Sequence, residues 1–385
     1  TDQDLVRLFV CRANDFTGTA CGVGGTWASS TYAASNPSVS YTLPNPSPKG
    51  TSTAYGFVID SHGLFAAING SQASNTPVVV NNMTPSISSS SVNIINPSLN
   101  LTVLEGETTG FQAQFTVSDQ NSCQTLAATP EITSARIDLR RSSIASTSCA
   151  VSGDYNPNNC YPGTLPTSVW NASCTASSTT CLGTSDSDVV WTCTFPLWYV
   201  ADATDPGSAF AAQNWLLSAQ AADTSNASST RTDAANGTEL IQFLGYALST
   251  TTIAYGGLQP GNSADLTSST AVGLRAIGNV GLDETLYGTD MCPNYPNCSG
   301  NATSTIFVNN QKYASSTMAY SAATSTLAYN PGALFPLRVP KTTSTSTPNS
   351  LNTYWGILVP ASITQSGDYV GVNTIIGATS PSSAW

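Results

Sequence analysis

Charged side chains are scarce in this sequence. Asp, Glu, Lys and Arg together make up 9% of its 385 residues, whereas about 25% is usual for soluble domains. Serine and threonine take their place, with 104 residues between them. A surface so poor in charge keeps a freely diffusing monomer in solution only weakly. The composition therefore suits a protein whose surface is covered by neighbouring subunits, by sugar, or by both.

Basic residues and histidine are scarcer still. Eleven Lys and Arg stand against 22 Asp and Glu, a net charge of −11. Without a basic stripe we expect no nucleic-acid partner. The single histidine, His62, stands two residues after Asp60 in "IDSHGLF", and no GxSxG motif accompanies it. We therefore interpret it as a polar turn residue and not as the base of a catalytic triad.

Enzymatic motifs are also lacking. Two carboxylates suffice for glycoside hydrolysis, but the chain has only five glutamates and none lies in a recognisable motif. The sequence predicts that the protein is not an enzyme and has no catalytic residues or organic cofactor.

Long apolar runs are missing as well. No stretch approaches 18 apolar residues, so no membrane span is predicted. Instead, short runs rich in β-branched and aromatic residues alternate with period two, for example "FQAQFTVSD", "VVWTCTFPLWYV" and "TYWGILVP". Turn residues at intervals of about 8–12 residues are typical of antiparallel sandwiches. The predicted fold class is all-β, with tandem antiparallel Ig-like β-sandwich domains.

Polar, turn-rich stretches divide the chain into three predicted segments. Residues 1–80 form the first Ig-like domain, which ends at the joint "NNMTPSISSSS". Residues 81–249 form a cysteine-rich Ig-like domain with long loops. Residues 250–385 begin near "YGGLQPG" and form a C-terminal Ig-like β-sandwich.

Ten cysteines with one histidine favour disulfides over zinc, and none forms a CxxC motif. Cys11 and Cys21 are expected to close a hairpin, and Cys292 and Cys298 a short loop. Cys174–Cys181 is a plausible local bridge, whereas Cys123, Cys149, Cys160 and Cys193 are paired in an order that the sequence leaves open. Five bridges imply an oxidising compartment, so we expect an exported, extracellular protein at the cell surface.

Several motifs in order carry a resemblance that covers nearly the whole chain. They include "DLVRLFVCRANDFTGTAC", "EGETTGFQAQFTVSDQNSC", "GNVGLDETLYGTDMC" and the closing "TYWGILVPASITQSGDYVGVNTIIGATSPSSAW". Together they resemble the C-terminal part of the large exported Ig-like surface proteins of the candidate-phyla (Patescibacteria) type. The resemblance implies an Ig-like fold and a location on the cell surface.

The same resemblance bears on the opening strand. "DLVRLFVC" resembles an internal strand of an Ig-like repeat, which one or two strands normally precede. The first domain would then lack its first strand or strands. Either the chain is a piece of a longer precursor, or another molecule supplies a strand to the open sheet edge. The alternative is that residues 1–10 contain an ordinary first strand.

Four aspartates each follow an apolar strand: Asp119, Asp202, Asp205 and Asp223. If the strand ends cluster, these carboxylates could supply some of the six to eight oxygens that calcium requires. Such an ion would stiffen a joint between domains. The alternative, which is the commoner arrangement, is that each aspartate caps its own turn.

Eight Asn-X-Ser/Thr sequons permit glycosylation: Asn69, Asn82, Asn100, Asn171, Asn226, Asn236, Asn297 and Asn301. With 29 Asn and 104 Ser and Thr, about eight are expected by chance, so their number carries no weight. Tryptophans in alternating strands, namely Trp170, Trp191, Trp198, Trp215 and Trp355, could stack on sugars. We expect them in the core instead.

The sequence as a whole predicts an extracellular structural protein. We expect a subunit of a pilus-like cell-surface filament or of a surface layer, with copies of itself as partners, assembled by strand or domain docking. The alternative is an adhesin that binds a host cell or glycans through the loops at one end of a sandwich.

Overall fold

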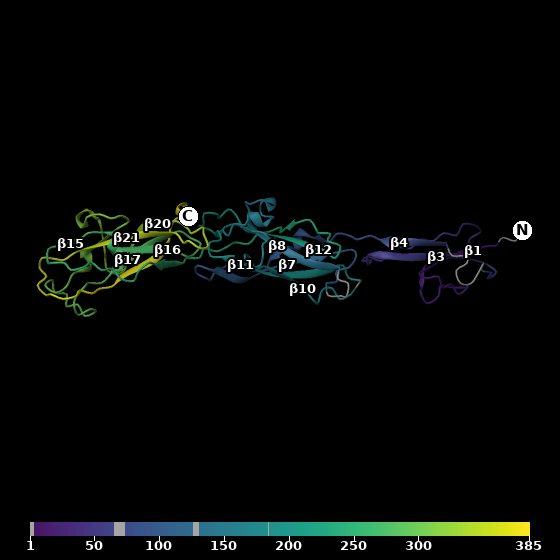
Figure 1. Cartoon of the computed structure of the whole chain (residues 1–385), viewed down its shortest axis with the longest axis horizontal. Coiled ribbons are helices and arrows are strands. Elements are labelled where there is room, and N and C mark those ends of the chain that lie inside the picture. Colours follow the sequence, from purple (N-terminus) through teal and green to yellow (C-terminus); the bar gives the residue numbers. More distant parts are fainter. Residues whose placement is uncertain (1–3, 65–73, 126–130, 184) are drawn as a thin grey trace.

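Three groups of β-strands follow one another along an elongated molecule, with the N-terminus at one tip (Figure 1). The computed structural model describes residues 4–64, 74–125, 131–183 and 185–385. These residues form antiparallel strands and one-turn 3₁₀ helices, so the predicted all-β class is confirmed. The 3₁₀ helices are η1 Ser89–Ser91, η2 Ser146–Ser148, η3 Ser152–Asp154, η4 Ser268–Thr270, η5 Val308–Asn310, η6 Tyr320–Ala322 and η7 Ser382–Ala384.

The first segment is a single four-stranded sheet in the order β2-β1-β3-β4. Its strands are β1 (Val6–Cys11), β2 (Thr26–Ser29), β3 (Gly50–Asp60) and β4 (Ser74–Val80). One face is covered by the loop that follows β1, because the Phe16 ring stacks on Phe57 at a centroid distance of 4.8 Å. Phe9 and Ile59 complete this small core.

This arrangement corrects the predicted Ig-like sandwich for residues 1–80. Among the residues described there, no second sheet faces the first. The reason lies in residues 30–49, which carry Pro37, Pro44, Pro46 and Pro48 and contain no strand. Proline has no N–H to donate to a ladder and so disfavours strand pairing.

The opening strand has a partner on each side. β1 pairs with β2 on one side and with β3 on the other. It is therefore an inner strand whose two neighbours both come from this chain. The edges of this sheet are β2 and β4, so any strand supplied by another molecule would have to pair with one of these.

The middle segment is a sandwich of two antiparallel sheets. One has the order β10-β11-β7-β5, with β6 also on β7, and the other has the order β13-β12-β8-β9. Alternate residues of β7, including Phe111, Phe115 and Val117, pack against Leu139, Trp215 and their neighbours in one continuous core. The strands are β5 (Ser86–Ile87), β6 (Asn93–Ile94), β7 (Glu107–Ser118), β8 (Ile132–Arg141), β9 (Cys160–Tyr161), β10 (Ser173–Ala176), β11 (Asp188–Trp198), β12 (Trp215–Asp223) and β13 (Thr232–Asp233).

The third segment is a second sandwich. Its sheets have the orders β14-β16-β21-β18-β19, with β15 on β21, and β20-β17-β22. Because Tyr246 already pairs with Ala276, this segment begins before the predicted boundary at residue 250. The strands are β14 (Tyr246–Leu248), β15 (Ser263–Ala264), β16 (Ala271–Ala276), β17 (Leu282–Gly288), β18 (Gln311–Ala314), β19 (Ser325–Thr326), β20 (Ala333–Val339), β21 (Ser350–Leu358) and β22 (Asn373–Thr379).

Five disulfides join all ten cysteines. Cys11–Cys21 and Cys292–Cys298 are the two local pairs expected from their spacing. The local bridge expected between Cys174 and Cys181 is not formed. Cys174 instead lies directly opposite Cys193 in the β10–β11 ladder and bonds to it, since a cross-strand neighbour is closer than a residue seven positions along the chain. The remaining bridges are Cys123–Cys181 and Cys149–Cys160. Five disulfides indicate an exported protein.

Candidate functional site

Three buried carboxylates converge at the joint between the first and middle segments. Asp119, Glu131 and Asp223 each place one oxygen within 4.8 Å of the other two. The exposed fractions of these residues are 1%, 7% and 1%. We call these three carboxylates the acidic cluster. Burying charge without compensation is unfavourable, so the acidic cluster requires compensating groups nearby.

Strand direction explains why these three residues meet. Asp119 follows the end of β7, Glu131 precedes the start of β8, and Asp223 ends β12. β8 and β12 are antiparallel, with Ile132 opposite Asp223. The start of one strand therefore lies beside the end of the other, and the end of β7 meets them from the facing sheet.

Polar groups from both sides of the joint surround the acidic cluster. Lys49 Nζ lies 2.9 Å from Glu131 Oε1 and 3.0, 2.6 and 2.8 Å from the side-chain oxygens of Asn82, Thr224 and Ser225. Its three N–H groups are therefore shared among four acceptors. Asn82 Nδ2 donates to Asp223 Oδ2 at 2.7 Å. These hydrogen bonds tie residues on both sides of the joint to one another.

Asn121 adds a second set of contacts across the joint. Its Nδ2 donates to the backbone carbonyls of Ser47 and Asn81, and its Oδ1 accepts from the N–H of Met83. The side-chain amide of Asn121 therefore makes three hydrogen bonds, all to residues at the joint between the first and middle segments. Polar side chains carry these contacts across the joint, in contrast to the apolar cores within each segment.

Asp119 is the least compensated member of the acidic cluster. Its Oδ1 accepts from the N–H of Asn121 at 2.7 Å, whereas its buried Oδ2 has no hydrogen-bond partner among the described residues. Burial raises the pKa of the Asp119 carboxyl, and the charges of Glu131 and Asp223 raise it further; the backbone N–H of Asn121 and, more weakly, that of Ser122 oppose this shift. A cation placed between the three carboxylates would relieve both the repulsion and the missing partner.

The other two predicted ligands lie elsewhere. β11 is antiparallel to β7, with Trp198 opposite Glu107, so Asp202 and Asp205 fall at the opposite end of the sandwich. The four aspartates Asp119, Asp202, Asp205 and Asp223 therefore do not form one cluster: Asp119 and Asp223 lie together, and Asp202 and Asp205 lie at the other end of the sandwich. Glu131 was missed because we considered only carboxylates that follow a strand. In an antiparallel pair, a carboxylate just before the start of one strand lies at the same end of the sheet as a carboxylate at the end of the neighbouring strand.

Asp202 instead holds the joint between the middle and third segments. Its Oδ1 lies 3.1 Å from Lys341 Nζ, and its Oδ2 lies 3.4 Å from Arg141 Nε. Lys341 also donates to the Val200 carbonyl at 2.6 Å and to Asn158 Oδ1 at 2.9 Å. Burial lowers the pKa of Lys341, and the charge of Asp202 opposes this shift. Two cations therefore face one buried carboxylate at this joint, whereas at the first joint three carboxylates lie close to Lys49.

The third segment buries a carboxylate without a cation close by. Glu284, in β17, is 1% exposed and accepts a hydrogen bond from the Thr353 hydroxyl. Burial raises its pKa to about 7; the Thr353 hydroxyl opposes this shift, and the neighbouring charge of Asp283 adds to it. Glu284 is therefore largely neutral below pH 7 in the folded protein.

The raised pKa of Glu284 predicts that the free energy of unfolding depends on pH. The unfolded chain ionises Glu284 near pH 4.5, whereas the folded chain does so near 7. The free energy of unfolding therefore falls by about 3 kcal/mol as the pH rises from about 4.5 to 7. In Glu284→Gln, which keeps an acceptor for Thr353, this loss should disappear. Denaturant unfolding at pH 5 and pH 8 measures it; an unchanged difference between the two pH values in Glu284→Gln would contradict the assignment.

The remaining predicted residues have ordinary structural surroundings. His62 Nδ1 lies 3.2 Å from Asp4 on the surface, and Asp60 caps the turn by accepting from the N–H groups of His62 and Leu64. Trp170, Trp191, Trp215 and Trp355 are buried, as expected for core residues, and Trp198 is half-buried.

The sequons differ in their accessibility. Asn82 is half-buried, and its side-chain nitrogen, to which a glycan would attach, is hydrogen-bonded to Asp223. Asn69 lies outside the described residues. The exposed sequon asparagines are Asn100, Asn171, Asn226, Asn236, Asn297 and Asn301.

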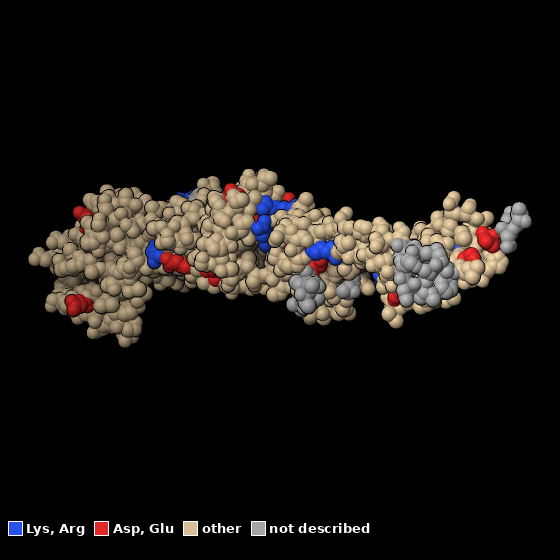
Figure 2. Space-filling model, turned by 45° about the vertical axis from the view of Figure 1, so that its right-hand side comes forward, with Lys and Arg blue, Asp and Glu red and all other residues tan. Residues whose placement is uncertain are grey.

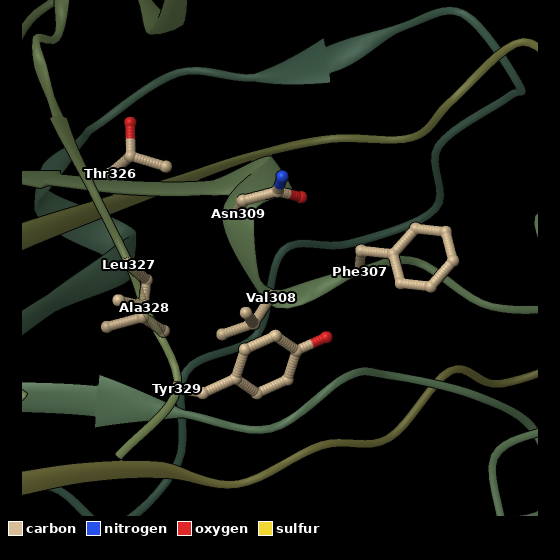
Figure 3. A pocket seen from close by; sticks show the side chains of 7 residues that line it. All are labelled: Phe307, Val308, Asn309, Thr326, Leu327, Ala328 and Tyr329. Atoms are coloured by element: carbon tan, nitrogen blue, oxygen red, sulfur yellow. The ribbon is translucent and has the colours of Figure 1, made fainter. Parts of the chain in front are cut away.

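Two surface hollows lie on the third segment. The smaller, of about 450 Å³, is lined by residues 307–309 and 326–329, with Val308 and Leu327 against the core (Figure 3). The larger, of about 660 Å³, lies beside β15, since its lining includes Ile357, which pairs with Ala264 of β15. Figure 1 shows β15 at the tip remote from the first segment. Ile306, Ile357 and Ile363 line it from within, and Gln259, Thr364 and Asp368 are among its polar residues.

The surface carries few charges. Figure 2 shows Lys, Arg, Asp and Glu as isolated spots on a surface made mostly of other residues. No helix of the described chain is both long and apolar enough to cross a membrane.

Comparisons with known proteins add little. No family model matches the chain, and no curated protein matches it. Among solved structures, a Corynebacterium diphtheriae protein described as membrane anchored has 9% identity and a TM-score of 0.17, covering 98% of this chain and 81% of that one. The α-L-rhamnosidase of Dictyoglumus thermophilum has 8% identity and a TM-score of 0.14, covering 98% of this chain and 45% of the enzyme. Neither score reaches 0.5, so neither likeness supports an argument about fold or function.

Proposed function

We propose that the chain is an extracellular structural protein, the subunit of a pilus-like cell-surface filament or of a surface layer. The observation that carries this proposal is the elongated shape: three β-segments lie in line (Figure 1). An ion pair lies at each joint, Lys49–Glu131 at the first and Lys341–Asp202 at the second. Each of the five disulfides joins two cysteines of the same segment. An elongated subunit with few charged residues suits repeated contacts with copies of itself.

The open first sheet offers a place for such contacts. β4 pairs only with β3 among the described residues, and its Val79 side chain is 56% exposed. An edge strand can accept a strand from another molecule through its free backbone groups. In a filament, a contact between unlike ends of successive subunits repeats without closing.

Pro77 indicates which backbone groups of β4 are free. It has no N–H, and the β3–β4 ladder runs from Gly50–Val80 to Gly56–Ser74 without a register shift. Its backbone therefore points away from β3. Since the orientation alternates along a strand, the backbone of Val79 also points outward. Pro77 itself limits pairing at the centre of this edge.

Substituting Val79 tests docking at this edge. Val79→Pro removes an outward N–H without touching the β3 ladder, and Val79→Thr keeps the N–H and the strand preference. At about 0.5–1.5 kcal/mol per hydrogen bond, the proline should raise the concentration needed for assembly by up to about tenfold. Electron microscopy and sedimentation of native and variant protein measure this.

Regular filaments or a lattice from the native protein and from Val79→Thr, with fewer from Val79→Pro, would support the proposal. Equal assembly of both variants would remove β4 as the contact. Dispersed rods of the native protein under all conditions would contradict assembly altogether.

The hollow beside β15 favours a second candidate, an adhesin that binds a host cell or glycans. It lies at the tip remote from the first sheet and combines an apolar lining with polar side chains, as ligand pockets generally do. An adhesin should stay monomeric and bind cells or glycans saturably, whereas a structural subunit should assemble without a ligand.

A further inference from the structure

The acidic cluster at the first joint is short of positive charge. Three carboxylates converge, and among the described residues Lys49 is the cation near them; of the three carboxylates it contacts Glu131 alone. The Lys49 side chain is 27% exposed, so it lies towards the outside, whereas Asp119 and Asp223 are each 1% exposed. The inner part of the acidic cluster therefore holds two buried carboxylates without a cation of their own.

A second observation also indicates a ligand. Asp119 Oδ2 is buried and has no hydrogen-bond partner in the described part of the chain. Buried polar atoms are almost always paired, and an orphaned carboxylate oxygen is costly. Turn capping accounts for Asp119 Oδ1 and for Asp223 Oδ1, which accepts from the N–H groups of Ser225 and Ala227. It leaves Asp119 Oδ2 unexplained.

We propose that Asp119, Glu131 and Asp223 bind a calcium ion, which fixes the joint between the first and middle segments. Calcium–oxygen distances of about 2.3–2.6 Å allow opposite ligands to lie about 4.6–5.2 Å apart. The observed spread of at most 4.8 Å fits this range. The inference concerns the joint and holds whether or not the chain polymerises.

The chemistry of the site favours calcium over other metals. The three side chains are all hard oxygen donors, which suit calcium or magnesium and not soft metals. Magnesium demands near-ideal octahedral geometry and retains its waters, whereas calcium accepts irregular sets of carboxylates, amide oxygens and carbonyls. Asn82 Oδ1 and Ser225 Oγ lie next to the acidic cluster, at 3.0 and 2.8 Å from Lys49 Nζ, and are oxygens of the kind that calcium accepts.

The second joint supplies a contrast within the same molecule. There Asp202 faces both Lys341 and Arg141, so its charge is already compensated. An ion has nothing to neutralise at that position. Calcium should therefore act on the first joint alone.

The test uses the full chain after treatment with EDTA and dialysis. Calorimetric titration with CaCl₂ should give one bound ion, with a dissociation constant of about 10⁻⁴–10⁻³ M, as in extracellular modules. Thermal unfolding should show a Tm that rises with calcium. Magnesium at the same concentration should give a smaller rise, and an equal rise would overturn the choice of calcium.

Asp119→Asn separates the site from a purely structural role. Because it removes a buried, unpaired charge, the variant should be at least as stable as the native protein without calcium. It should bind calcium at least about tenfold more weakly, since it loses one charged ligand. Asp205 Oδ1 is likewise buried without a hydrogen-bond partner in the described residues, but Asp205 lies outside the acidic cluster, so Asp205→Asn should keep the full response.

Two results would overturn the proposal. One is the absence of heat and of a Tm shift when millimolar calcium is added to the native protein. The other is an undiminished calcium response in Asp119→Asn. A loss of the response in Asp205→Asn would equally reject the assignment of the site to the acidic cluster.

Discussion

Replacing Lys341 by methionine is expected to destabilise the protein by about 3–5 kcal/mol, the usual cost of removing one partner of a buried ion pair. Methionine keeps the length and apolar character of the stem, so packing is largely preserved. The Val200 carbonyl and Asn158 Oδ1 would each lose a donor, and Asp202 would keep only the longer contact with Arg141. Denaturant unfolding followed by tryptophan fluorescence measures the loss.

A double variant distinguishes lost charge pairing from lost packing. Adding Asp202→Asn to Lys341→Met removes the carboxylate that has lost its nearer cation. The losses of the two single variants should therefore not add, with a coupling energy within about 0.5–3 kcal/mol. A Lys341→Met protein as stable as the native one would show that the buried pair contributes nothing. Additive losses in the double variant would show that the two side chains act independently.

Removing the Cys123–Cys181 bridge is expected to cost about 4 kcal/mol. The cysteines are 58 residues apart, and the entropy that a disulfide removes from the unfolded chain grows with the length of the loop that it closes. The matched control is Cys292–Cys298, whose cysteines are only 6 residues apart. By the same relation its removal should cost about 2 kcal/mol. Both double-alanine variants can be compared by denaturant unfolding.

The difference between the two bridges is the informative quantity. Equal losses would show that local packing, and not the unfolded chain, determines how much each bridge contributes. A smaller loss for Cys123–Cys181 than for Cys292–Cys298 would contradict the loop-length argument outright.

Local pattern accounts for the parts of the fold that were predicted correctly. In β7, Phe111, Ala113, Phe115 and Val117 alternate with polar residues, and all four are buried. Such alternation reports burial of one face of a strand, so it identifies strands well. It does not report whether a second sheet covers that face. In the first segment the loop carrying Phe16 does so instead, which alternation alone could not reveal.

Disulfide pairing and the acidic cluster depend on strand neighbours far apart in the sequence. Cys174 meets Cys193 because of the register between β10 and β11. Glu131 joins Asp223 because β8 and β12 run in opposite directions. Neither relation is contained in the spacing of residues along the chain. The direction of each strand would have sorted the aspartates correctly, placing Asp119 and Asp223 at one end and Asp202 at the other.

The direction of the strands has a mechanical consequence. The long strands β3, β7, β8 and β11 run along the axis of the rod (Figure 1). Tension along this axis loads their ladders in shear, so many hydrogen bonds must break together and not one after another. Trp385 packs beside Val280 and Leu282, and the C-terminus lies near the second joint. Pulling between Val6 and Trp385 would therefore strain the first and middle segments, while the far half of the third segment, with the hollow beside β15, would bear no load.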